Sequence, residues 1–172
     1  MRVELIEGDI TACTTDVIVN AANSSLLGGG GVDGAIHRKG GPAILEDCRR
    51  LRAGKYGRGL PTGEAVATTA GNLAARWVVH TFGPVYSRTT DRSALLRSCY
   101  STSLSIADEL GAQSIAFPLV SAGIYGWPVD DAVRQALSVL RSANPAHLRV
   151  AQLVLYGRPT FEAALTVKSA AQ

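Results

Sequence analysis

Two stretches of this sequence place small and polar residues directly after the pattern of a buried strand. The first contains Asn20, Asn23, four consecutive glycines at 28–31, and Asp33. Glycines let backbone N–H groups approach an anion closely, and a helix beginning there adds the positive end of its dipole. Asparagine offers both a donor and an acceptor to sugar hydroxyls. The alternative readings are a flexible turn for the glycines and a helix-start carboxylate for Asp33.

The second stretch follows the apolar residues around Phe117. Ser121, Gly123 and Gly126 could cradle a phosphate, and Tyr125 could form a wall against a ligand. For Trp127 we favour a structural role at the entrance of the following helix. Two such loops after two buried strands predict one crevice at the carboxyl ends of the sheet, where a pyrophosphate could lie between them.

The sequence gives little indication of a metal site, a disulfide framework or another known catalytic motif. His37, His80 and His147 share no metal-like spacing, and the interpretation we favour for each is a structural or exposed histidine. The three cysteines form no CxxC or Cys/His pattern, which argues against a zinc site or a disulfide framework. There is no GxSxG elbow, and no GK[ST] follows the glycines as a Walker loop requires. We expect no metal and no cofactor.

Composition narrows the class of protein. The chain has 172 residues, 47% of them hydrophobic, and a net charge of +3, which suits a single globular domain over residues 1–172. The N-terminus lacks a signal-peptide layout, and the longest uncharged run, 110–129, contains Pro and Gly. We therefore expect a cytoplasmic protein with no membrane partner.

A basic cluster lies between residues 49 and 58 and consists of Arg49, Arg50, Arg52, Lys55 and Arg58. We favour a helix C-terminus followed by a solvated loop, since cations are stabilised at that end of the helix dipole. The alternative is contact with an acidic or nucleic-acid partner.

Apolar periodicity predicts the elements that carry the two loops. Strands are predicted at 3–6, 17–19, 65–69, 77–82, 114–120 and 150–156. Helices are predicted at 32–39, 42–52, 93–110, 129–141 and 160–170, and an exposed loop at 53–63. Alternation of strands and helices indicates an α/β fold with helices on both faces of the sheet.

Several motifs together resemble the macro domain family, in particular the MacroD type, which includes bacterial ADP-ribosyl hydrolases. The resemblance extends over residues 1–156. It is carried by Gly8-Asp9-Ile10, Asn20-Ala21-Ala22-Asn23, residues 28–36, Pro61-Thr62-Gly63, residues 79–84 and residues 121–128. The resemblance implies a three-layer α/β/α sandwich with a central mixed sheet of about six strands.

The resemblance also implies ADP-ribose as the ligand and assigns a part of it to each motif. Asp9 would accept from the adenine amino group beside Ile10, and Tyr156 would stack on the adenine. Asn23 and Asp33 would hold the distal ribose, where the reaction occurs. The pyrophosphate would be lined by Gly30, Gly31 and Val32 on one side and by Ser121, Ala122, Gly123, Ile124 and Tyr125 on the other, with Tyr125 also against the ribose.

The implied reaction is metal-independent hydrolysis at the distal ribose of mono-ADP-ribose esters on Asp or Glu side chains of proteins, and of O-acetyl-ADP-ribose. Asp33 would position or deprotonate the attacking water, and the sequence leaves both roles open. Two alternatives stay open as well: a non-catalytic ADP-ribose reader, and a macro domain acting on ADP-ribosylated nucleic acid.

The sequence departs from the common family pattern in three places. Ala122 stands where many relatives have Thr, and Leu60 stands where Cys is frequent. Tyr156-Gly157-Arg158 replaces an acidic stretch, so Arg158 could contact the adenosine side. Asn23 and Asp33 are unaffected by these changes.

Overall fold

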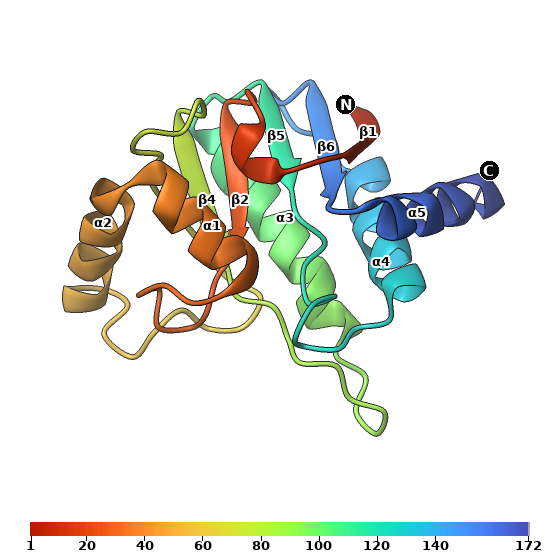
Figure 1. Ribbon diagram of the computed structural model, residues 1–172, viewed down its shortest axis with the longest axis horizontal. Coiled ribbons are helices and arrows are strands. Elements are labelled where there is room, and N and C mark those ends of the chain that lie inside the picture. Colours follow the sequence, from red (N-terminus) through yellow and green to blue (C-terminus); the bar gives the residue numbers. More distant parts are fainter. Residues whose placement is uncertain (172) are drawn as a thin grey trace.

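A computed structural model describes residues 1–171, which form a six-stranded sheet with helices on both faces (Figure 1). The strands are β1 (Arg2–Glu7), β2 (Val17–Ala21), β3 (Ala65–Thr69), β4 (Trp77–Thr81), β5 (Ser114–Phe117) and β6 (Val150–Leu155). The helices are η1 (Ile10–Ala12, a 3-10 turn), α1 (Gly31–Gly40), α2 (Pro42–Ala53), α3 (Ser93–Glu109), α4 (Val129–Ser142) and α5 (Arg158–Ala170).

The strand order is β1-β6-β5-β2-β4-β3. Neighbouring strands are parallel except β3 and β4, which pair antiparallel. The predicted α/β sandwich with a mixed six-stranded sheet is therefore confirmed.

Two apolar clusters hold the layers together. Because side chains alternate along a strand, Val17 and Val19 face one layer while Ile18 faces the other. Val17 and Val19 belong to the cluster under α3, α4 and α5, and Ile18 belongs to the cluster under α1 and α2. Burial on both faces explains why β2 reads as a continuous β-branched run.

Predicted element boundaries agree with the structure to within two residues, except at the end of β5. The prediction extended this strand to Val120, whereas the structure ends it at Phe117. Pro118 has no N–H to donate to a neighbouring strand, so the ladder stops there. The three-residue turn η1 was not predicted, because it is too short to show a helical period.

Among residues 1–171, no helix combines the length and apolar character that crossing a membrane requires.

Replacing a buried side chain of β6 tests this arrangement. Leu153 is fully buried in the α3–α5 cluster, whereas Leu165 on α5 is 41% exposed. We expect Leu153→Ala to lower the free energy of unfolding by about 2–5 kcal/mol through lost burial and a residual cavity. Leu165→Ala should cost less than about 1 kcal/mol. Urea unfolding monitored by circular dichroism measures both, and equal losses would contradict the burial described here.

Candidate functional site

The carboxyl ends of four parallel strands bring the predicted site residues to one edge of the sheet. β1, β6, β5 and β2 are consecutive neighbours. They lead respectively into Asp9, Tyr156, a loop at 118–128 and a loop at 22–31. The segments that follow these four strands therefore form a row along the edge of the sheet. The residues predicted to contact the adenine lie at one end of this row, and the residues predicted to contact the distal ribose lie at the other.

The two central loops separate because their helices lie on opposite faces of the sheet. We name residues 22–31 the first glycine loop and residues 118–128 the second glycine loop. The first runs from β2 into α1, and the second runs from β5 into α4, on the other face. Neighbouring strands whose connections diverge in this way form the usual ligand position of an open α/β sheet.

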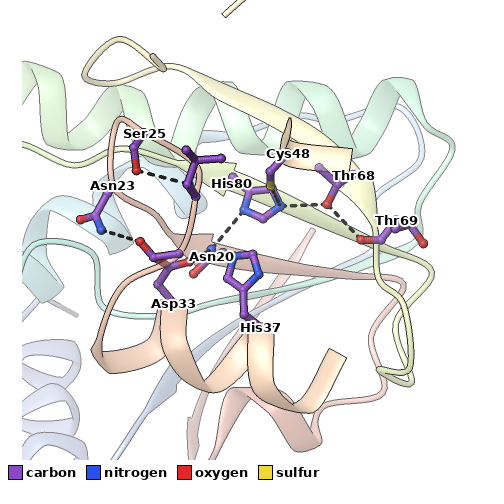
Figure 2. A network of polar contacts seen from close by, with 11 residues as sticks. Asn20, Asn23, Ser25, Asp33, His37, Cys48, Thr68, Thr69 and His80 are labelled. Atoms are coloured by element: carbon purple, nitrogen blue, oxygen red, sulfur yellow. Dashed lines mark hydrogen bonds and ion pairs between the residues drawn. The ribbon is translucent and has the colours of Figure 1, made fainter. Parts of the chain in front are cut away.

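Asp33 lies in the first turn of α1, and its side chain is buried. Its Oδ1 accepts a hydrogen bond of 2.7 Å from Asn20 Nδ2, and His37 Nε2 lies 3.3 Å from the same oxygen (Figure 2). Asp33 Oδ2 is also buried but has no hydrogen-bond partner within residues 1–171. One carboxylate oxygen is thus held by the protein, while the other is a buried acceptor without a hydrogen-bond partner among residues 1–171.

Asn20 and His80 complete a buried polar network that we did not predict. They lie opposite each other on β2 and β4, and both are fully buried. Asn20 Nδ2 lies 3.1 Å from His80 Nδ1, and Thr68 Oγ1 lies 2.8 Å from His80 Nε2. Burial, with a smaller effect of the nearby His37, lowers the pKa of His80 to about 3. A polar residue at the end of an apolar strand run was the only local signal.

Asn23 connects the two glycine loops. Its Nδ2 donates to the Gly28 carbonyl at 3.1 Å, and its Oδ1 accepts from the Tyr125 hydroxyl at 3.4 Å. The Tyr125 ring in turn meets Phe82 edge-on, with ring centroids 6.2 Å apart. Asn23 itself is exposed, so its amide faces solvent between the loops.

The glycines of these loops serve two different needs. A Cβ at Gly29 would collide with Asn23 Nδ2 and would lie 3.1 Å from Asp33 Oδ2. At Gly30, Gly31, Gly123 and Gly126, by contrast, a Cβ would meet no atom within 4 Å. Packing therefore does not require glycine at these four positions, but Gly31 and Gly126 have φ of +58° and +74°, which favours glycine in any case. At Gly30 and Gly123, glycine leaves the backbone of its loop open to close approach from outside.

Ser121 contributes its backbone rather than its hydroxyl to the second glycine loop. Its Oγ donates to the Pro84 carbonyl at 2.7 Å, and its φ is +67°, which is unusual for a residue with a side chain. Ala122 is half-buried, and Ile124 is almost fully exposed. Trp127 is buried with its Nε1 donating to Asp131 at 2.9 Å, which confirms its structural role at the start of α4.

At the other end of the row, Asp9 and Tyr156 are both exposed, Tyr156 by 83%. Asp9 Oδ1 accepts from the hydroxyl and the backbone N–H of Thr11, and these bonds lower the pKa of the Asp9 carboxyl. Ile10 is buried and belongs to the apolar cluster under α1 and α2. Arg158 forms ion pairs with Glu7 and Glu162.

Part of the basic cluster supports the first glycine loop. Arg52 Nη1 donates to the Ser25 carbonyl at 2.8 Å, a role that sequence reasoning missed. Arg50 pairs with Glu46 and Asp47 on its own helix. Arg50 and Arg52 thus have hydrogen-bond or ion-pair partners inside the protein, and Lys55 Nζ lies 5.5 Å from the centroid of the Tyr56 ring. On the buried face of α2, the pKa of the Cys48 thiol is raised to about 12, first by burial and then by nearby Asp33 and Asp47.

Within the part of the chain that the structure describes, no group of three or more His, Cys, Asp or Glu side chains is arranged to hold a metal ion. His147 lies apart from the other two histidines and contacts the Asp108 carbonyl.

Comparison with known proteins gives one consistent family. A family model described as "Macro domain" matches residues 19–136. A macro domain-containing protein of Streptomyces coelicolor is 61% identical over 94% of this chain and 95% of its own length. A protein of Escherichia fergusonii named O-acetyl-ADP-ribose deacetylase is 54% identical over 74% of this chain and 71% of its own length.

Solved structures of similar fold carry related ligands. A macrodomain of Oceanobacillus iheyensis with ADP has a TM-score of 0.94 and 38% identity, covering 98% of this chain and 90% of the other. A Trypanosoma brucei macrodomain in complex with ADP-ribose has a TM-score of 0.84 and 38% identity, covering 98% and 69%.

The buried histidine predicts a pH-dependent stability. His80 stays neutral in the folded protein above pH 3 or so, whereas an unfolded histidine protonates near pH ~6.5. Between these values the unfolded state binds more protons, so stability falls as pH falls. We expect the free energy of unfolding to drop by about 2 kcal/mol between pH ~7.5 and pH ~5.

Urea unfolding at several pH values measures the slope of the free energy of unfolding against pH. His80→Asn removes the titrating ring, and its slope over the same pH range should be shallower. Carboxylates titrate mainly below this range, so they contribute little to the difference. Identical slopes for the two proteins would show that His80 is not the group responsible.

Proposed function

This chain belongs to the macro domain family, and we propose that it binds ADP-ribose and hydrolyses mono-ADP-ribose esters on Asp or Glu side chains of proteins, as well as O-acetyl-ADP-ribose. The observation that carries the proposal is Asp33, a buried carboxylate with one oxygen held by Asn20 and the other without a partner among residues 1–171. We further propose that residues 1–172 form one macro domain that acts in the cytoplasm.

In this proposal the diphosphate lies between the two glycine loops. Gly30, Gly31, Val32 and residues 121–125 present their backbone to it, supported by the open space beside Gly30, Gly31 and Gly123. Several backbone N–H groups and the N-terminus of α1 can then share the negative charge. The adenosine extends toward Asp9, Ile10 and Tyr156, where the exposed Tyr156 ring is free to stack on the base.

The distal ribose lies beside Asn23, Asp33 and Tyr125. Asn23 holds a ribose hydroxyl, and Asp33 Oδ2 accepts a hydrogen bond from the attacking water and orients it. The water supplies its hydroxyl to one side of the cleaved ester bond and its proton to the other. The products are a free carboxylic acid and ADP-ribose for protein esters, or acetate and ADP-ribose for the acetylated nucleotide.

Nucleic acid is the weaker alternative as a substrate. The basic cluster that motivated it has Arg50 in ion pairs within α2 and Arg52 bonded to the first glycine loop. Both arginines therefore already have partners within the protein. The proposed reaction site around Asp33, by contrast, consists of a few neighbouring residues. A non-catalytic ADP-ribose reader would bind its ligand in the same position. Only a measurement of turnover distinguishes such a reader from a hydrolase.

Filling the space beside the first glycine loop should block the ligand. We expect Gly31→Glu to weaken ADP-ribose binding by about tenfold or more, since its carboxylate would repel the diphosphate. Gly111→Glu is the matched control: both glycines have positive φ and open space at Cβ, but Gly111 follows α3 away from the loops. Isothermal titration calorimetry measures both. Equal affinities for the two variants would refute the proposed diphosphate position.

Removing the carboxylate should abolish turnover while leaving ligand binding in place. We expect Asp33→Ala to slow release of ADP-ribose from a protein mono-ADP-ribosylated on glutamate by about 10²-fold or more. Its affinity for ADP-ribose should stay within about threefold of wild type, a change below ~1 kcal/mol. The assay contains EDTA, because the proposed reaction needs no metal.

Asp130→Ala provides the control, because Asp130 occupies the first turn of α4 as Asp33 occupies that of α1. It removes a helix-start carboxylate without touching Asp33, and its turnover should match wild type. Turnover by Asp33→Ala at the wild-type rate would overturn the assignment. ADP-ribose binding by a wild type that releases nothing would identify a reader.

A further inference from the structure

His80 is a fully buried titratable side chain that the proposed reaction does not use. Figure 2 shows it between Asn20 on one side and Thr68 on the other, in line with Asp33. Its remaining polar neighbours are Cys48, whose Sγ lies 3.9 Å from Nε2, and His37, whose ring centroid is 6.3 Å away. A buried imidazole with a partner on each nitrogen has a defined tautomer, and that tautomer can be deduced from the partners.

Thr68 determines which ring nitrogen carries the proton. The Thr68 hydroxyl donates its only hydrogen to the Thr69 carbonyl at 2.9 Å. Its oxygen must therefore accept at the 2.8 Å contact with His80 Nε2, so Nε2 carries the proton. His80 Nδ1 is consequently an acceptor, and it receives an N–H from the Asn20 amide at 3.1 Å.

The orientation of the Asn20 amide follows from the same series of hydrogen bonds. Its Nδ2 has two hydrogens, and it faces His80 Nδ1 on one side and Asp33 Oδ1 at 2.7 Å on the other. A flipped amide would place its oxygen against two acceptors at once. Asn20 Oδ1 has no partner within residues 1–171, so nothing on that side competes with the two N–H bonds.

We propose that His80, held in its Nε2–H tautomer by Thr68, is a positioning residue that locks the Asn20 amide and thereby leaves Asp33 Oδ2 as the oxygen that orients the water. This role rests on the proposed function. It adds strands β3 and β4 to the site, because Thr68 on β3, His80 on β4 and Asn20 on β2 act in series on one carboxylate. None of Thr68, His80 and Asn20 needs to touch the substrate.

Variants at His80 separate this role from simple core filling. His80→Leu keeps an apolar side chain of similar size but offers Asn20 no acceptor, whereas His80→Asn can place an amide oxygen near the position of Nδ1. We expect His80→Leu to lower kcat by about tenfold to a hundredfold with KM changed less than threefold or so, because a small misplacement of a catalytic group is costly. His80→Asn should recover most of that loss.

Two variants of Thr68 provide an independent test of the positioning role. Thr68→Val keeps the shape but removes the acceptor for Nε2–H, and Thr68→Ser keeps the hydroxyl. We expect a lower kcat in Thr68→Val and near wild-type kcat in Thr68→Ser. Leu140→Ala controls for destabilisation, because Leu140 is buried on α4 in the cluster on the opposite face of the sheet. Its kcat should equal that of wild type at a temperature where all variants are folded.

The tautomer itself is measured without any substrate. Long-range proton–nitrogen NMR of the wild type should show His80 with a protonated Nε2 and an unprotonated Nδ1 across neutral pH. A protonated Nδ1, or wild-type kcat and KM in His80→Leu, would overturn the positioning role. If the wild type releases no ADP-ribose although the tautomer is as deduced, the proposed function fails first and the catalytic role of His80 fails with it.

Discussion

The hydrogen bond from Asn20 to Asp33 is the interaction on which the site depends. A carboxylate inside a protein is costly unless hydrogen bonds replace its water. Asp33 obtains one such bond, at 2.7 Å, from an amide on the neighbouring strand β2, and His37 lies 3.3 Å from the same oxygen. Because the amide is itself held by His80, the carboxylate is anchored to the sheet rather than to a loop. A group held by packed strands keeps its geometry better than one on a mobile segment.

The strand order sets what this anchored carboxylate can meet. β5 lies between β2 and β6, and β6 lies next to β1. The loops after these strands therefore run in sequence from Asp33 to Asp9, far apart in the chain but neighbours at the sheet edge. Glycine at positions where the protein itself has room for a Cβ gives this row an accessible backbone. This row suits the elongated ligand that we propose, with its diphosphate between the two glycine loops and its distal ribose at the Asp33 end.

The sequence was informative where the signal is local. Apolar runs and glycine loops predicted the six strands, an α/β fold with helices on both faces of the sheet, and a glycine loop beside Asp33. The three-layer sandwich with a mixed sheet came from the family resemblance. The network behind Asp33 was not predictable in this way, because Asn20 and His80 meet only through the register of β2 against β4. The periodicity of one strand assigns its residues to the two faces of the sheet, but it does not say which distant strand lies beside it. The same limit hid the bond from Arg52 to Ser25, which joins positions 27 residues apart.

Departures from ordinary local structure gather around this one place. Leu26 and Ser121 adopt positive φ, one in each glycine loop, and they are the non-glycine residues among 1–171 that do so. Such conformations cost about 1–3 kcal/mol each and persist only where the surroundings impose them. Asp33 and His80 are buried titratable groups in the same region. These exceptions mark where selection for stability alone does not explain the residues.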